Sequence, residues 1–276
     1  MGLRINTNMP SLTAQRVMTK NTTRLDHAEQ ALATGSRIVH AGDDAAGLAV
    51  SENIKGQLGG IKAARNNAYN AISLVQISEG GLNEISNILI RLRELGVQAA
   101  SDTVGDTERE FLNRETTQLL EESQRIAKST RFGNKTLLDN SGEEFEYHVG
   151  PFADAETNVI KYKITADATN DALGIDGLSV ASKEGARDVL GAVDKALIKV
   201  GSMRADFGAV QSRLQTTVSN LDIQHENMSA AKSRIADADI AYESSEMATA
   251  QILNEASIAT LAHANQNNAA ALKLLG

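Results

Sequence analysis

Apolar residues in the C-terminal part of the chain recur at alternating steps of four and three residues, from Val189 to Ala259. A 3.5-residue repeat of this length keeps one stripe of a helix against a partner, as in a coiled coil. No proline interrupts the stretch, so the repeat predicts long paired helices. The members of this C-terminal seam used below are Phe207, Leu214, Leu221, Ile252, Ala256 and Ala259.

Two stripes with the same spacing lie in the N-terminal half, one from Ala14 to Leu32 and one from Ala68 to Ala99. Long seams at both ends of one chain can pair with each other, so we expect the chain to fold back on itself as an antiparallel helical rod. The larger residues of the first stripe are Met18, Leu25 and Leu32, and those of the second are Leu82, Leu89 and Leu92.

Glycine and acidic residues divide these stripes into separate helices. Gly35 is expected to end the first helix, and Asp43 or Asp44 to cap the second. A turn around Gly105 separates the second helix from a shorter third one. The predicted helices cover residues 10–34, 45–100, 107–129 and 184 to the C-terminus, the last with a break around Ala236-Asp237.

Residues 130–180 follow a different pattern, in which aromatic and β-branched residues alternate with polar ones. This period of two predicts two strands joined as a long hairpin. Residues 174–183 contain glycines and polar side chains and are expected to form a surface connection. The predicted fold is therefore mainly α, an antiparallel coiled-coil or helical-bundle rod with a small β-hairpin region. The alternating residues are Phe145, Tyr147 and Val149 in one strand, and Ile160, Tyr162 and Ile164 in the other.

The composition favours thin helical bundles over a thick globular core. Aromatic residues make up only 3% of the 276 positions, Trp is absent, and Ala occurs 40 times. The C-terminal seam also changes to small residues towards its end, and an Ala-lined seam gains little from pairing two helices. We therefore expect both terminal segments to be loose in the monomer and ordered when many copies pack together, whereas residues 46–235 should fold alone.

The net charge of −8 argues against nucleic acid as a partner, because its phosphates repel an acidic surface. The charge is unevenly spread: residues 1–45 carry five Lys or Arg against four Asp or Glu, and residues 236–276 carry one against five. Opposite signs on the two terminal segments favour their pairing modestly, since exposed ion pairs contribute roughly 0–1 kcal/mol each.

No stretch approaches the length of about 20 apolar residues that a membrane-spanning helix needs. The first ten residues lack the charged and apolar regions of a cleavable signal peptide. Alone, this pattern predicts a cytoplasmic protein, although it leaves room for export by a route that keeps the N-terminus intact.

The sequence carries no pattern for catalysis, for a cofactor or for a metal. The five His are scattered without His-Glu-x-x-His spacing, and there is no Cys and no Gly-x-Ser-x-Gly. The glycine pairs lack the residues of a phosphate loop. The pair Asp43-Asp44 is explained better as a helix cap than as an acid/base site. We therefore predict that the chain is not an enzyme.

In the segment 90–98, Leu92 lies on a seam, and Arg91, Glu94 and Leu95 are expected to point outward or to flank it.

Short motifs occur at both ends of the chain. They are Ile5-Asn6-Thr7-Asn8, Ala33-Thr34-Gly35-Ser36-Arg37-Ile38, Asp43-Asp44-Ala45-Ala46-Gly47, Glu79-Gly80-Gly81-Leu82-Asn83-Glu84-Ile85, Arg91-Leu92-Arg93-Glu94-Leu95, Ser233-Arg234-Ile235-Ala236-Asp237-Ala238-Asp239 and Ala262-His263-Ala264-Asn265-Gln266. Each motif is weak by itself, but together and in this order they are specific. With these motifs the sequence resembles bacterial flagellin, and the likeness covers nearly the whole chain.

The resemblance implies a structural subunit that polymerises into an extracellular flagellar filament for motility. It assigns residues 1–45 and 236–276 to an inner D0 domain, and 46–180 and 181–235 to an outer-tube D1 domain. The gap at 174–184 is too short for the outer domains of longer flagellins. The family further implies unfolded export by the flagellar type III apparatus without signal cleavage, an export chaperone on the C-terminal segment, and contacts with hook-associated and cap proteins.

The resemblance also implies a surface for the vertebrate flagellin-sensing Toll-like receptor. The matching positions here are Arg91, Leu95 and Glu115. Two neighbours depart from the family's usual pattern, Gly96 in place of Ala and Ile90 in place of a polar residue. Both changes are expected to weaken recognition, and the same residues are expected to pack inside the outer tube.

Three other interpretations remain open from the sequence. A hook–filament junction protein shares the terminal seams, but the agreement at Asp237-Ala238-Asp239 and Asn265-Gln266 favours the filament subunit. An intracellular coiled-coil scaffold would form a stable dimer whose size does not depend on the termini. Some flagellins carry a metalloprotease insert, but the His-Glu-x-x-His that it needs is absent.

Overall fold

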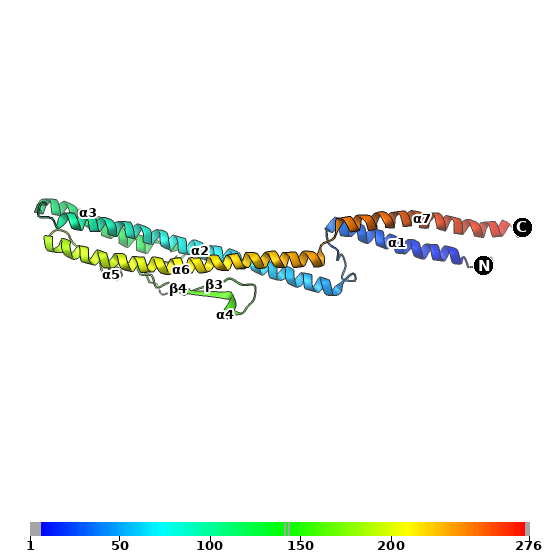
Figure 1. Ribbon diagram of the computed structural model, residues 1–276, viewed down its shortest axis with the longest axis horizontal. Helices are drawn as coiled ribbons and strands as arrows, with labels where there is room; N and C mark the ends of the chain where they lie inside the picture. The colour runs from blue at the N-terminus through cyan, green and yellow to red at the C-terminus, as the bar shows by residue number, and fades with distance from the viewer. Residues whose placement is uncertain (1–6, 141, 143, 274–276) are drawn as a thin grey trace. The chain divides into compact units, whose positions relative to one another are not determined.

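The computed structural model describes residues 7–140, 142 and 144–273, with side chains as far as residue 266. They form two compact units, one made of the residues up to Gln57 with those from Glu226 on, and a central unit over Leu58–His225. The chain is mainly α-helical with two small antiparallel sheets (Figure 1), which confirms the predicted fold class. The long helices are α1 Met9–Thr34, α2 Ala45–Ala99, α3 Asp106–Ser129, α6 Lys183–Ala236 and α7 Ile240–Lys273.

The helix boundaries confirm the predicted caps. Gly35 ends α1 with φ of 69°, a left-handed conformation that glycine adopts without strain, and its N–H donates to Ala31. Asp44 begins α2, because its Oδ1 accepts the Gly47 N–H at 2.8 Å. Asp43 does not cap this helix. The predicted break near Ala236 is also present, since α6 ends there and α7 begins at Ile240.

In the central unit, α2 and α6 run antiparallel. Three ion pairs follow this direction, because the partner on α6 moves towards the N-terminus as the residue on α2 moves towards the C-terminus. The six seam residues of these helices are all buried between them and their neighbours: Leu82, Leu89, Leu92, Phe207, Leu214 and Leu221. The pairs are Arg65–Asp222 at 2.9 Å, Glu79–Arg204 at 3.5 Å and Arg93–Asp194 at 2.9 Å.

The predicted hairpin forms from β3 Glu144–His148 and β4 Val159–Lys163, which pair antiparallel. The ring of Tyr162 lies 5.9 Å from that of Phe207, so the hairpin packs on α6. Burial raises the pKa of Tyr162 and of Tyr147 to about 12, and the Tyr147 hydroxyl has no hydrogen-bond partner among the described residues. Four short elements were not expected from the sequence: β1 Arg131–Phe132, β2 Lys135–Thr136, α4 Ala155–Asn158 and α5 Asn170–Leu173.

The segment 174–183 is not simply a surface connection, and that prediction was wrong. Ile175 and Val180 have no exposed surface, and Leu178 packs partly buried against the core. Apolar residues at short intervals turn inward here and cover the side of the bundle, whereas the polar residues between them face solvent. Glycines at positive φ, Gly174 and Gly177, let the chain turn between these anchors.

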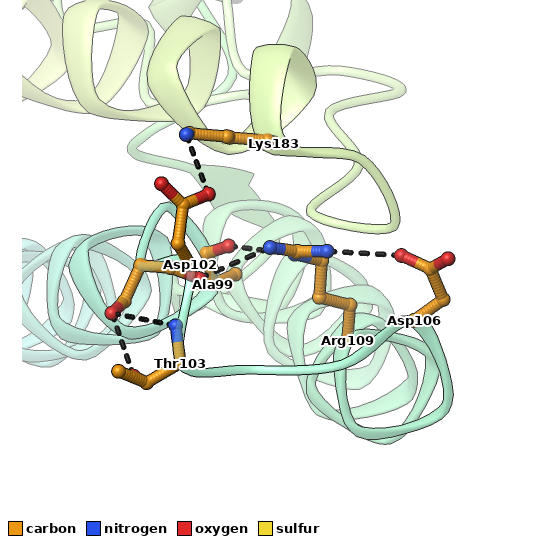
Figure 2. A network of polar contacts seen from close by, with 7 residues as sticks. Ala99, Asp102, Thr103, Asp106, Arg109 and Lys183 are labelled. Atoms are coloured by element: carbon orange, nitrogen blue, oxygen red, sulfur yellow. Dashed lines mark hydrogen bonds and ion pairs between the residues drawn. The ribbon is translucent and has the colours of Figure 1, made fainter.

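A buried arginine joins the end of α2 to the start of α3 (Figure 2). The guanidinium of Arg109 donates to the carbonyl oxygens of Ala99 at 2.9 Å and Ser101 at 3.0 Å, and to Asp106 at 2.9 Å. It thereby satisfies carbonyls that the end of α2 leaves without helical partners and places a cation at a helix C-terminus. Nearby, Lys183 at the start of α6 donates to Asp102 at 2.6 Å.

Replacing Arg109 by Ala should lower the free energy of unfolding of the central unit by roughly 2–3 kcal/mol, because one buried and one partly buried carbonyl lose a charged donor. Urea unfolding followed by circular dichroism would measure this. The matched control is Asp106→Asn, whose carboxylate is 97% exposed, and it should leave the free energy of unfolding nearly unchanged. Equal effects of the two substitutions would contradict the role assigned to Arg109.

Candidate assembly surfaces

The two terminal helices, α1 and α7, lie side by side in their unit and run antiparallel (Figure 1). Small residues fill the contact, so the two backbones approach closely. Few large apolar groups are buried there, and the pairing therefore stabilises less than the packing of the central unit does. The buried alanines are Ala14, Ala28, Ala31, Ala250 and Ala264.

Polar contacts set the register of this helix pair. Asn21 donates to the Ser257 hydroxyl at 3.1 Å in a buried contact, and Ser257 donates in turn to a backbone carbonyl. Arg24 pairs with Glu246 at 2.9 Å. This pair has the signs expected from the opposite charges of the two segments, but both side chains are partly exposed, so its contribution is small.

The connector between α1 and α2 is tied to the break between α6 and α7. The Arg37 side chain donates to the Ile235 carbonyl at 2.8 Å, and the Ala238 N–H donates to the Gly35 carbonyl at 2.9 Å. No local signal in the sequence assigns this role to Arg37, because the carbonyl that it binds belongs to α6, 198 residues along the chain.

Asp43 holds the connector itself. Its Oδ2 accepts the N–H groups of His40 and Val39 and lies 3.2 Å from Nε2 of His27 on α1. The His40 N–H is the main cause that holds the pKa of Asp43 below its usual value, and the other N–H and His27 act in the same direction. This carboxylate therefore organises backbone rather than chemistry.

The face of α7 that meets α1 differs from the predicted one. Ile252 is 66% exposed, and Ala256 and Ala259 are exposed as well. Ala250 and Ser257 are buried instead, so the buried stripe of α7 does not coincide with the seam expected from the heptad repeat. The non-helical residues between α6 and α7 reset the phase of the heptad repeat, so the seam of α6 does not continue onto the same face of α7.

On α1 the predicted face does meet α7. Met18, Leu25 and Leu32 are partly buried, beside the buried residues Ala14 and Ala28 of the same stripe. The two terminal stripes thus differ in burial. The stripe of α1 is partly buried, whereas Ile252, Ala256 and Ala259 of α7 are exposed, with Ala256 at a groove shared with α1.

Apolar side chains remain uncovered on this helix pair. A groove of about 550 Å³ lies between the helices. Several large apolar side chains of α1 and α7 are also exposed, among them Leu12, Ile252 and Ile258. Exposed apolar groups that gather on one part of a surface can mark a site of association. The groove is lined by Met9, Pro10, Thr13, Ala14, Val17, Asn21, Leu253, Ala256, Ser257 and Thr260.

Comparison with known proteins supplies the family. The sequence-family model for the bacterial flagellin N-terminal helical region matches residues 5–143. The family model for the bacterial flagellin C-terminal helical region matches residues 190–275. The chain belongs to the bacterial flagellin family. It is a structural subunit of a flagellar filament, and the family assignment predicted from the sequence motifs is confirmed.

Curated relatives align with almost the entire chain. A flagellin of Halalkalibacterium halodurans is 40% identical over 271 residues, which is 98% of this chain and 99% of the relative. A flagellar filament core protein of Brachyspira hyodysenteriae is 38% identical over 286 residues, with 98% and 99% covered. The crystal structure of Bacillus cereus flagellin superposes with a TM-score of 0.51 at 31% identity, covering 60% of this chain and 94% of that one.

The positions that match the receptor surface of flagellins do not form one exposed patch. Arg91 donates to Glu115 at 2.8 Å and to Glu94 at 2.9 Å, and Glu115 is the main cause that raises its pKa. Leu95 has no exposed surface, so the expectation that it points outward or flanks the seam was wrong. It follows Leu92 by three residues and precedes Ala99 by four, which places it on the same buried stripe of α2.

Within the described residues of this flagellin, no group of three His, Cys, Asp or Glu side chains could hold a metal ion. No described helix is long and apolar enough to cross a membrane. The motif residues Ile5 and Asn6 lie outside the described residues. The family itself is one of structural proteins.

Proposed function

We propose that the chain polymerises through its paired terminal helices. In this proposal residues 1–45 and 236–276 form the D0 domain that lines the filament channel, and residues 46–180 and 181–235 form the D1 domain of the outer tube. The observation that carries it is the apolar surface left uncovered on α1 and α7. Burial of that surface against further copies is favourable, at about 25 cal/mol per Å² of apolar area.

The seam residues divide between two roles in this proposal. Met18, Leu25 and Leu32 hold α1 against α7 within a copy, since they are turned inward. Ile252, Ala256 and Ala259 face the next copy, since they are exposed in the single chain. A surface that meets a different surface of the next copy repeats without closing, and such a contact produces a helical fibre.

Electron microscopy of the purified full-length chain after addition of a precipitating salt tests the proposal. The comparison is a chain trimmed to residues 46–235, which lacks both terminal helices. Long uniform tubes are expected from the full chain, and none from the trimmed one. Small discrete oligomers from both would favour a coiled-coil scaffold and would contradict the proposal.

The same exposed apolar side chains bear on how the chain is exported and protected before it polymerises. We infer export by the flagellar type III apparatus without signal cleavage, with a chaperone covering residues 236–276 until secretion, and contacts with hook-associated and cap proteins at the filament ends. Support comes from Ile252 and Ile258, which need a cover in a single copy. Co-purification of the chaperone with the full chain, and its loss when residues 236–276 are removed, would test this.

Recognition by a flagellin-sensing Toll-like receptor is a second candidate, centred on Arg91 and Glu115. It is favoured by their charged side chains, which are about half exposed although they pair with each other. Leu95 would take no direct part, because its side chain is covered. A cell reporter assay with the Arg91→Ala variant tests the candidate, and an unchanged response would exclude it.

A further inference from the structure

Two cavities flank residues 170–179 in the central unit, which comprise α5 and the loop after it and are called the loop below. Leu178 lines both cavities. One cavity, of about 510 Å³, lies between α3 and the loop, and we call it the acceptor cavity. The other, of about 540 Å³, lies between the loop and α6, and we call it the basic groove. The polar residues that matter below are Glu121, Asn170 and Asp176 in the acceptor cavity, and Arg187, Lys195 and Lys199 in the basic groove.

Asn170 contributes an unpaired hydrogen-bond acceptor to the acceptor cavity. The residue is only 6% exposed, and its Nδ2 donates to the Leu120 carbonyl on α3 at 2.8 Å. Its backbone N–H donates to Gln124 Oε1 at 2.7 Å. These contacts fix the amide and leave Oδ1 buried without a hydrogen-bond partner among the described residues. A buried acceptor without a partner costs free energy, so a hydrogen-bond donor that enters this cavity and reaches Oδ1 would be favoured.

The charge of the acceptor cavity narrows the choice of donor. Glu121 and Asp176 both line it, no Lys, Arg or His does, and neither carboxylate has an ion pair within the described part of the chain. An ammonium group carries three N–H donors and no acceptor, so it matches one amide oxygen and two carboxylates. The complement of this cavity is therefore a cationic side chain.

The basic groove offers such a side chain on the other side of the loop. Three cations line it against one carboxylate, Asp188. Lys199 is held in place, because its Nζ donates to the Ala172 carbonyl at 2.6 Å. Lys195 is exposed, and in the described structure it makes no hydrogen bond or ion pair. In a chain of net charge −8, this is a local concentration of positive charge.

We propose that Lys195 of one copy enters the acceptor cavity of a neighbouring copy in the filament. The inference rests on the proposed polymerisation and names one lateral contact within it. Because cavity and groove are different surfaces on opposite sides of one loop, the contact is heterologous and repeats from copy to copy. Charge complementarity of this type favours encounter and fixes register.

A cross-linking experiment tests the contact directly, because the chain has no Cys. Full-length Asp176→Cys and Lys195→Cys chains are polymerised together in equal amounts and treated with a short thiol-reactive cross-linker. Covalent dimers that contain one chain of each kind are expected. The matched control replaces Asp171, an exposed carboxylate of the same loop that lines neither cavity, by Cys. Equal dimer yields from Asp171→Cys and Asp176→Cys mixtures would overturn the proposal.

Charge reversal supplies an independent readout. Asp176→Lys and Lys195→Glu should each raise the critical concentration for polymerisation by about tenfold or more, since like charges then face each other. The double variant should return most of the way to the original value, and Asp171→Lys should have little effect. Additive effects of the two reversals would contradict the contact.

Two further outcomes separate this inference from its alternatives. If the unmodified chain forms no filament at all, the proposed function fails, whereas filaments that ignore all these substitutions overturn only the lateral contact. Calorimetry with spermidine on the monomer tests a free cation as occupant. Binding that Asp176→Lys abolishes, without a change in polymerisation, would show a ligand site for organic cations and would overturn the contact between copies.

Discussion

Replacement of Ile252 by Asp should block filament formation and leave the monomer folded. The side chain is 66% exposed on the face of α7 that points away from α1, so a carboxylate there remains in water in the single chain. In the proposed inner tube the same carboxylate would be buried without a partner. We expect the critical concentration for polymerisation to rise by more than about a hundredfold, corresponding to a cost of roughly 3 kcal/mol or more.

Sedimentation of salt-induced polymers measures this effect, and circular dichroism of the monomer shows whether the helices persist. Ile252→Leu keeps the apolar character and should polymerise nearly as the unmodified chain does. Ala250→Asp provides the contrast, because Ala250 is buried against α1 and its substitution should already disturb the helix pair in the monomer. Normal filaments from Ile252→Asp would exclude this residue from the inner tube.

Replacement of Phe207 by Ala should lower the free energy of unfolding of the central unit by roughly 3–5 kcal/mol. The ring is fully buried between α6 and its neighbours and contacts Tyr162 of the hairpin, so its removal leaves a cavity and deprives the hairpin of a packing surface. Leu214→Ala, at the next fully buried position of the same stripe, should cost roughly 2–5 kcal/mol.

Urea or thermal unfolding of the monomer measures both effects. Ile198→Ala is the matched control, since Ile198 lies on the same helix but is 74% exposed, and surface substitutions usually change stability by less than about 0.5 kcal/mol. If Phe207→Ala melts like Ile198→Ala, Phe207 does not anchor the core.

The central seam shows where sequence patterns are reliable. Val, Leu and Phe recur there at heptad spacing along one face of α2 and of α6, and Leu89 and Leu214 on that face are buried. The helix ends could also be predicted from the sequence. The Gly35 N–H donates to a carbonyl at the end of α1, and the Asp44 side chain accepts an N–H at the start of α2.

For the terminal helix α7, the sequence pattern does not predict which face packs against α1. Ala, Ser and isolated apolar residues are spread around it, so its sequence favours no single face for pairing with α1. The choice depends on contacts across the helix pair, such as that of Asn21 with Ser257, which the sequence of α7 alone does not reveal. The break after Ala236 adds to this, because it frees α7 from the phase of α6.

The candidate sites also fall into features that the sequence predicts and features that need the tertiary structure. The order of motifs along the sequence identified the family, because the chemistry of each residue and its position in the chain suffice for that. The burial of Leu95, the clamp made by Arg109 and the unpartnered oxygen of Asn170 each depend on a second element that packs from elsewhere in the chain.

The sequence by itself thus determined the long helices, their ends, the hairpin and the family, because periodic burial and helix capping are local properties of neighbouring residues. The tertiary structure alone decided which face of α7 stays exposed, and where charged cavities form around residues 170–179. These depend on distances between residues far apart in the chain, and no local pattern encodes such distances.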